Sequence, residues 1–279
     1  MTLWMITGAG RGLGRAFAAA ALERGDRVVA TIRQDGVLDD LAKEYGDRLA
    51  VRRLDVSSAT EVSAVVAEVV ETVGTPDVVV NNAGYGLVGA VEELSEAELR
   101  AQFDVNFFGA VWVTQAVLPH LRARGSGRIV QVSTVGAVGH LPLFGAYNAS
   151  KWALEGLSSA LAAEVAPLGL GVHLLQLGGF ATDWAGGSMR FATAGPAYDG
   201  TREAILGAPS YPELLVEPGA STDESPAVAA QALLALVDDA DAPLRKVVGA
   251  GAHDMVRMAL EWRRDDYQRD PEFTWPPAS

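Results

Sequence analysis

Short apolar runs alternate with longer amphipathic stretches along almost the whole 279-residue chain. Most of these runs are apolar at nearly every position rather than at every second one. That pattern is typical of strands covered on both faces of a parallel sheet. We expect strands at residues 3–7, 27–32, 49–54, 77–81, 128–133, 170–177 and 245–249.

The stretches between these runs carry apolar residues at helical spacing. They predict helices at residues 12–24, 59–73, 96–121 and 147–165, with a further helix after residue 226. Strands and helices that alternate in this way imply right-handed crossovers between parallel strands. The sequence therefore predicts an α/β fold, a single doubly wound Rossmann-type domain over residues 1–279 whose central parallel sheet is flanked by helices.

Residues 180–226 break this alternation. The segment is rich in Gly, Pro, Ser and aromatic residues, and it lacks a clear secondary-structure pattern. A long insertion of this kind in a compact domain is usually a lid or binding loop, or else it is disordered. Its aromatic side chains favour a substrate lid. Residues 253–279 follow the last strand as a C-terminal tail, and the first part of that tail, 253–268, is amphipathic.

The first strand leads directly into a glycine-rich turn, and an alanine-rich helix follows. Where Cβ atoms are missing, backbone N–H groups can approach a pyrophosphate, and the helix N-terminus adds partial positive charge. The alternative is a strand-to-helix turn with no ligand. Its place in the first βα turn favours dinucleotide binding. The residues expected to contact the dinucleotide here are Gly8, Gly10, Arg11, Gly12, Leu13 and Gly14.

The end of the second strand indicates which dinucleotide is bound. A site for NAD would place a carboxylate there to hold the ribose 2′-hydroxyl. This strand ends instead in Arg33, and no carboxylate precedes Asp35. Arg33 can pair with a 2′-phosphate, and Arg11 in the glycine-rich turn can reach the same group. Either arginine alone could be a solvated surface residue, but the two together favour NADP(H) over NAD(H).

Tyr147 and Lys151 stand four residues apart at the start of a predicted helix. This spacing puts the phenol and the ammonium group on one helix face. Because a nearby cation favours the phenolate, we expect Lys151 to lower the pKa of Tyr147 and make it a usable acid–base group. The spacing alone is common, and most such pairs are surface contacts of little energetic value.

Composition narrows the function classes. The net charge is −13 and no basic stripe stands out, which argues against nucleic-acid binding. The chain has no cysteine, so thiolate metal sites and cysteine nucleophiles are excluded, and its four histidines lack metal-ligand spacing. No run approaches the roughly 20 apolar residues that span a bilayer, and the chain shows no charged, cleavable leader. We therefore expect a cytoplasmic protein with no membrane partner.

Three motifs stand in order along the chain. They are Thr7-Gly8-x-x-x-Gly12-x-Gly14, then Asn81-Asn82-Ala83-Gly84 after the fourth strand, and then Tyr147-x-x-x-Lys151. In this combination the chain resembles the short-chain dehydrogenases/reductases of the classical type. The likeness extends from residue 3 to about residue 250.

The resemblance implies a role for individual residues. Tyr147 would exchange a proton with the carbonyl or alcohol oxygen while hydride moves to or from the nicotinamide. Lys151 would bond the nicotinamide ribose, and Asn106 would hold a water molecule in the proton relay. The other cofactor contacts that the resemblance implies are Asp55 and Val56 near the adenine ring, Asn82, Ala83 and Gly84 along the adenosine ribose, and Thr182 at the carboxamide.

The catalytic serine of the family has two candidates in this chain. Counting thirteen residues back from Tyr147 gives Thr134, whereas anchoring on Gly136 gives Ser133 and needs a one-residue insertion. We favour Thr134, because its hydroxyl can equally donate to a substrate oxygen. Its additional methyl group would restrict the rotamer and crowd the pocket.

Three further positions belong to the predicted site. The Pro-Gly that the family usually has after the sixth strand is Leu177-Gly178 here, and Gly178 still lies four residues before Thr182. His140, between the two candidate hydroxyls and Tyr147, and Trp184 in the lid are candidates for the substrate pocket. Ordinary loop and lid packing are the alternatives for these two.

The sequence thus predicts an enzyme that uses NADPH to reduce a ketone or aldehyde, reversibly, and that acts as a homodimer or homotetramer on a small-molecule substrate. One rival is a non-redox NADP-binding sensor or scaffold. Another is an isomerase or dehydratase on the same fold. The presence of Tyr147, Lys151 and Asn106 argues against the scaffold, which has no need of all three.

Overall fold

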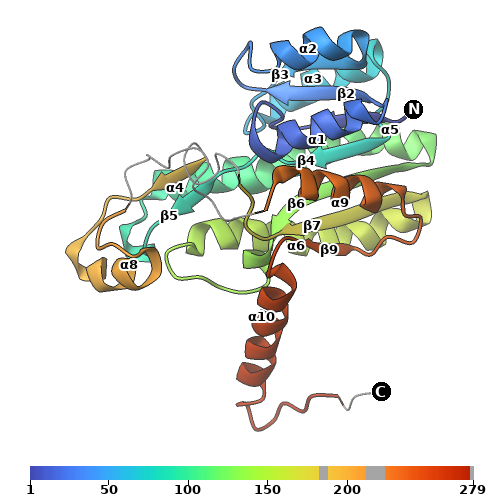
Figure 1. Ribbon diagram of the computed structural model, residues 1–279. Coiled ribbons are helices and arrows are strands. Elements are labelled where there is room, and N and C mark those ends of the chain that lie inside the picture. Colours follow the sequence, from blue (N-terminus) through green and yellow to red (C-terminus); the bar gives the residue numbers. More distant parts are fainter. Residues whose placement is uncertain (182–187, 212–223, 277–279) are drawn as a thin grey trace.

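Seven parallel strands form the central sheet of the computed structural model, which describes residues 1–181, 188–211 and 224–276 (Figure 1). The strand order is β3-β2-β1-β4-β6-β7-β9, so the order reverses between the neighbours β1 and β4. All seven predicted strands are present, each end within one residue of its expected position, and the α/β fold is confirmed. The strands are β1 Leu3–Ile6, β2 Arg27–Ile32, β3 Leu49–Arg53, β4 Val78–Asn81, β6 Gly127–Thr134, β7 Leu170–Leu177 and β9 Arg245–Val248.

Helices cover both faces of this sheet (Figure 1). Successive side chains of a strand point to opposite faces. Trp4 and Ile6 therefore pack with helices α1 and α9, whereas Leu3 and Met5 pack with α3, α5 and α6. The helices are α1 Gly12–Glu23, α2 Asp39–Tyr45, α3 Ala59–Thr72, α4 Glu96–Phe103, α5 Gly109–Arg124, α6 Gly145–Val165, α8 Asp199–Leu206, α9 Pro226–Asp238 and α10 Ala252–Tyr267.

The single helix predicted at 96–121 is divided in the structure. A π-helical turn, Asp104–Phe108, separates α4 from α5. Such wide turns often occur at functional sites, and this one contains Asn106. Because the apolar spacing on both sides of the turn is still helical, the sequence pattern does not reveal the division.

Part of the predicted lid has regular structure, contrary to the irregular segment that its composition indicates. Strand β8, Met189–Phe191, pairs in parallel with β5, Gly86–Val88, and α8 follows it. We call residues 188–211 the lid segment. The predicted tail contains α10, which extends away from the edge of the sheet (Figure 1).

Candidate active site

The glycine-rich turn brings helix α1 very close to the sheet. A Cβ added at Gly14 would lie 2.4 Å from the Gly8 carbonyl oxygen and 2.5 Å from Asn82 Nδ2. Gly8 itself has φ +65°, a backbone conformation that favours glycine. At the start of α1, Arg11 is the N-cap residue and its side chain makes no capping hydrogen bond. First-turn N–H groups of this helix are therefore suited to an anion.

The segment after β4 is hydrogen-bonded to the same turn. Asn82 Nδ2 donates to the carbonyl oxygens of Thr7 at 2.9 Å and of Gly8 at 3.2 Å. Thr7 Oγ1 accepts from the backbone N–H groups of Asn82 at 3.0 Å and of Ala83 at 3.1 Å. Since β1 and β4 are the strands between which the order reverses, the turn lies where doubly wound sheets bind dinucleotides.

The two residues expected near the adenine ring differ in their exposure to solvent. Asp55 is exposed after β3 and accepts hydrogen bonds from Ser57. Burial acts to raise the pKa of the Asp55 carboxyl, but Ser57 and the charge of Arg33 together lower it. Val56 is buried in the core, and its side chain leaves no room for a Cβ atom at position 109, which is glycine. Any ligand contact of Val56 therefore has to come from its backbone.

The remaining residues of the expected dinucleotide site lie around the glycine-rich turn. Arg11 and Arg33 are both exposed at the carboxyl edge of the sheet, next to β1 and β2. A Cβ added at Gly10 would lie 2.9 Å from Val37 of the loop after β2, so this loop covers the turn closely. Leu13 packs against the core from the first turn of α1. These positions could hold a dinucleotide at this edge of the sheet.

The candidate catalytic groups converge where β6 ends and α6 begins. Thr134, the last residue of β6, is hydrogen-bonded through its side chain to Tyr147. Lys151 is 4% exposed, and its Nζ donates to the Val132 carbonyl oxygen at 2.8 Å. A Cβ added at Gly84 would lie 3.6 Å from that Nζ, so the β4 segment reaches the same place. The structure thus brings together the phenol, the ammonium group and one hydroxyl.

The pKa of Tyr147 differs from the sequence expectation. Burial raises it to about 12, although the hydrogen bond with Thr134 acts to lower it. Burial also lowers the pKa of Lys151 to about 8. The net shift of the Tyr147 pKa is therefore upward, opposite to the lowering expected from Lys151, because the loss of hydration is the largest effect on both groups.

Asn106 is held rigidly by the segment that follows β4. Its Nδ2 donates to the Tyr85 carbonyl oxygen at 2.9 Å, and its Oδ1 accepts from the Tyr85 N–H at 3.0 Å. Nδ2 also lies 3.3 Å from Ser150 Oγ, next to Lys151 in the chain. The π-helical turn thereby places a buried amide beside the candidate catalytic helix.

The second candidate for the catalytic hydroxyl, Ser133, is hydrogen-bonded to Glu155. Its Oγ donates to Glu155 Oε1 at 2.7 Å, and the side chain is buried. Glu155 was not identified from the sequence as a site residue. Glu155 follows Lys151 by four residues, the same interval that separates Tyr147 from Lys151. This spacing places Glu155 on the same helix face and is the sequence signal that could have indicated it.

The other predicted site residues have mixed outcomes. His140 is exposed and lies against Trp262 of α10, with ring centroids 5.6 Å apart. Gly178 forms a close turn after β7, where an added Cβ would lie 3.2 Å from Ala252 Cβ. Thr182 and Trp184 lie outside the described residues.

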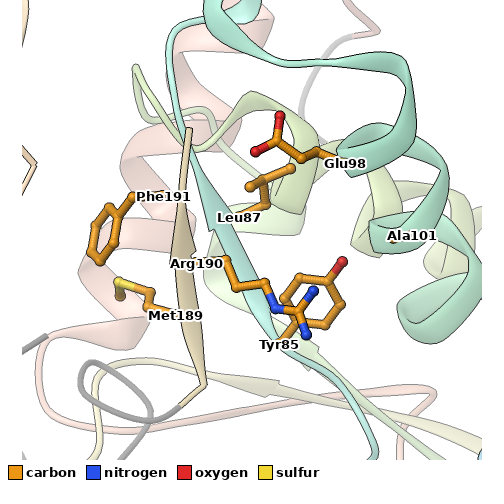
Figure 2. Close-up of a pocket in the computed structure, with 7 residues that line it drawn as sticks. All are labelled: Tyr85, Leu87, Glu98, Ala101, Met189, Arg190 and Phe191. Atoms are coloured by element: carbon orange, nitrogen blue, oxygen red, sulfur yellow. The ribbon is translucent and has the colours of Figure 1, made fainter. Parts of the chain in front are cut away.

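The lid segment packs beside the candidate catalytic groups. A cleft of about 350 Å³ separates β5 and β8 from α4, and the Arg190 guanidinium lies over the Tyr85 ring at 4.8 Å (Figure 2). The other residues that line the cleft are Leu87, Glu98, Ala101, Met189 and Phe191. An apolar cluster joins the lid segment to Leu143 and Phe144, just before Tyr147. An apolar cluster thus lies next to the start of α6 in the chain.

A buried ion pair anchors this lid segment. Arg202 of α8, 1% exposed, pairs with Glu93, whose side chain is 5% exposed. Glu93 also accepts hydrogen bonds from Tyr211 and from the backbone N–H groups of Gly195 at 2.6 Å and Ala90 at 3.1 Å. Burial acts to raise the pKa of the Glu93 carboxyl, but these donors together lower it to about 2.

Comparison with known proteins identifies relatives over nearly the whole chain. Residues 3–190 match the short chain dehydrogenase family. Oxidoreductase BOA17 of Botryotinia fuckeliana is 40% identical over 260 residues, which cover 93% of each chain. Retinol dehydrogenase 8 of Bos taurus is 33% identical over 265 residues, covering 90% of this chain and 82% of its own length.

Solved structures show the same fold. A short-chain dehydrogenase from Streptomyces avermitilis has a TM-score of 0.87 and 37% identity, covering 96% of this chain and 97% of its own. Some of the similar solved structures hold NADP and another holds NAD. Among the described residues, every helix is too short or too polar to cross a bilayer.

Proposed function

The chain belongs to the short chain dehydrogenase family of oxidoreductases, and we propose that it uses NADPH to reduce a ketone or aldehyde, with Tyr147 as the proton donor. The observation that carries the proposal is the hydrogen-bonded pair of Thr134 and Tyr147 beside the buried Lys151 ammonium. It stands next to the glycine-rich turn, at the carboxyl ends of the central strands.

Each of these residues has a part in the proton transfer. Because the pKa of Tyr147 is about 12, its phenol keeps the proton that a reduction consumes at neutral pH. Thr134 Oγ1 would donate to the carbonyl oxygen and orient it toward the phenol. Lys151 would bond the nicotinamide ribose and, through its charge, favour the phenolate left after the transfer. Bound NADPH supplies the hydride.

An apolar carbonyl compound is the substrate class that this site favours. Leu143 and Phe144 lie in the apolar cluster that joins the candidate catalytic loop to the lid segment. Such a surface gains free energy by removing apolar groups of a ligand from water. Within the lid segment, Arg190 and Arg202 are the cations, and Arg202 is already paired with Glu93.

A change in NADPH absorbance with a panel of ketones and aldehydes tests the proposal. We expect oxidation of NADPH in step with alcohol formation. Binding of NADPH without turnover would support the sensor or scaffold. Conversion of substrate without net oxidation of NADPH would support an isomerase or dehydratase. The assembled pair of Thr134 and Tyr147 favours an enzyme over the sensor or scaffold.

The preference for NADPH can be tested at Arg33. Replacing Arg33 with Asp removes the group proposed to pair with the 2′-phosphate and adds a repulsive carboxylate. We expect KM for NADPH to rise about 10–100-fold while KM for NADH stays the same or falls. Arg100→Asp, an equal charge change at an exposed position of α4, is the control. An unchanged ratio of the two KM values in Arg33→Asp would refute the preference.

Thr134 and Ser133 can be separated by two substitutions. Thr134→Val keeps the side-chain shape but removes the hydroxyl that bonds Tyr147, so we expect kcat to fall about 100-fold or more. Ser133→Ala leaves the contact between Thr134 and Tyr147 in place and removes one of the donors to Glu155, so we expect a smaller fall in kcat than in Thr134→Val. Steady-state kinetics at saturating NADPH measures both. The reverse order of effects would assign the catalytic hydroxyl to Ser133.

A further inference from the structure

A buried carboxylate lies behind the candidate catalytic pair. Glu155 follows Lys151 by four residues and Tyr147 by eight, so all three lie along one face of α6. The Glu155 side chain is 8% exposed, and an ionised carboxylate at such a position requires strong partners. The proton transfer described above makes no use of this group.

The partners of Glu155 come from three adjacent strands of the sheet. Its Oε1 accepts from Ser133 Oγ on β6 and from Gln176 Nε2 on β7, each at 2.7 Å. Its Oε2 accepts from Arg245 Nε on β9 at 2.9 Å. Ser133 and Gln176 are directly opposite one another in the register of β6 and β7. One carboxylate therefore ties α6 to β6, β7 and β9, which lie side by side (Figure 1).

Three successive residues of β6 are bonded to successive turns of α6. Lys151 donates to the Val132 carbonyl oxygen, Ser133 donates to Glu155, and Thr134 is bonded to Tyr147. Apolar packing between a helix and a sheet is non-directional and tolerates small shifts. Hydrogen bonds to a buried charge are short and directional, so the Glu155 contacts fix the position of α6 along β6.

We propose that Glu155 is a positioning residue for proton transfer by Tyr147, and this inference rests on the proposed function. By holding the end of β6 against α6, it keeps the Thr134 hydroxyl in contact with the phenol. Lys151 and Tyr147 lie on the turns of the helix directly before it. A displacement of about 1 Å at a reacting group can reduce a rate about 100-fold, which makes this register important for kcat.

Two substitutions at Glu155 and one control test the proposal. Glu155→Ala removes every contact, and we expect kcat to fall about 10–100-fold with unchanged affinity for NADPH. Glu155→Gln keeps an amide oxygen for Ser133 and Gln176, and we expect it to restore most of kcat. Ser158→Ala is the control, because Ser158 Oγ is buried on the same helix and has no hydrogen-bond partner among the described residues.

A second readout needs no substrate. The NMR signal of isotope-labelled Tyr147 Cζ in the ligand-free protein, assigned with Tyr147→Phe, reports the hydrogen bond with Thr134. We expect this signal to shift in Glu155→Ala but not in Ser158→Ala. If the unmodified enzyme reduces no carbonyl compound, the proposed function fails, and this signal alone decides the role of Glu155.

An apolar replacement separates positioning from stability. In the triple variant Ser133→Ala/Glu155→Leu/Gln176→Leu, the polar contacts of residue 155 with β6 and β7 are lost together. Replacing a buried polar cluster with apolar residues often leaves the free energy of unfolding unchanged. We expect this variant to unfold at a temperature near that of the unmodified protein but to lose kcat and shift the Tyr147 signal. An unchanged kcat and signal in a folded variant, or equal losses in Glu155→Ala and Glu155→Gln, would overturn the proposal.

Discussion

Tyr147→Phe should abolish nearly all reduction, with kcat about 10³-fold lower and NADPH affinity unchanged. The substitution removes only the phenolic hydroxyl, and the phenyl ring fills the space that the phenol occupies. The proton that the carbonyl oxygen needs then has to come from water or from Thr134, whose hydroxyl is a far weaker acid. Single-turnover kinetics with an apolar ketone measures the loss directly.

Two measurements show that such a loss is chemical rather than structural. The variant should unfold at the same temperature as the unmodified protein, and titration with NADPH should give the same dissociation constant. Tyr45→Phe, on the remote helix α2, should retain full activity. A Tyr147→Phe enzyme that keeps a tenth or more of kcat would remove Tyr147 from the role of proton donor.

The sequence predicted the sheet well because its strands are buried on both faces. Runs such as Val78–Val80 are apolar throughout, and local pattern and tertiary environment agree there. Helix α2 was not predicted, since it is short and Leu41 is its one fully buried residue. The turn at Asn106 was missed for a different reason. A π-helical turn adds a residue to a helix without changing the types of residue that favour it.

The candidate site was predicted where it depends on residues close in sequence. The glycine-rich turn and the Tyr147–Lys151 pair are local patterns with fixed spacing. The partners of Glu155 are not local, because Ser133, Gln176 and Arg245 meet only through the order and register of β6, β7 and β9. The pKa of Tyr147 was also beyond sequence reasoning, since it depends on how much water the folded chain removes from the phenol.

Glu93→Gln should destabilise the lid segment strongly. Among the described residues, the Glu93 carboxylate accepts hydrogen bonds from Arg202, from Tyr211 and from two backbone N–H groups. A glutamine would turn an amide N–H₂ group toward some of these donors and leave the buried Arg202 without a counter-charge. Removing one partner of a buried ion pair lowers the free energy of unfolding by about 3 kcal/mol. A loss of this size lowers the unfolding temperature by about 6–12 °C.

The contribution of Glu93 should also depend on pH in a defined direction. The pKa of its carboxyl falls from an ordinary value of 4.5 to about 2 in the folded protein. The folded state therefore binds fewer protons than the unfolded state between these values, and stability rises with pH there. The difference in unfolding free energy between the unmodified protein and Glu93→Gln should be largest above pH 4.5. It should disappear as the pH falls toward 2.

Thermal unfolding at several pH values measures the global effect, and hydrogen exchange at residues 195–211 measures opening of the lid segment alone. Glu92→Gln is the matched control, because Glu92 is adjacent but exposed and accepts a single hydrogen bond, from Tyr198, among the described residues. If Glu92→Gln and Glu93→Gln behave alike in both measurements, the ion pair with Arg202 does not hold the lid segment. If only hydrogen exchange responds, the lid segment opens independently of the sheet, since Glu93 then stabilises a local unit rather than the whole domain.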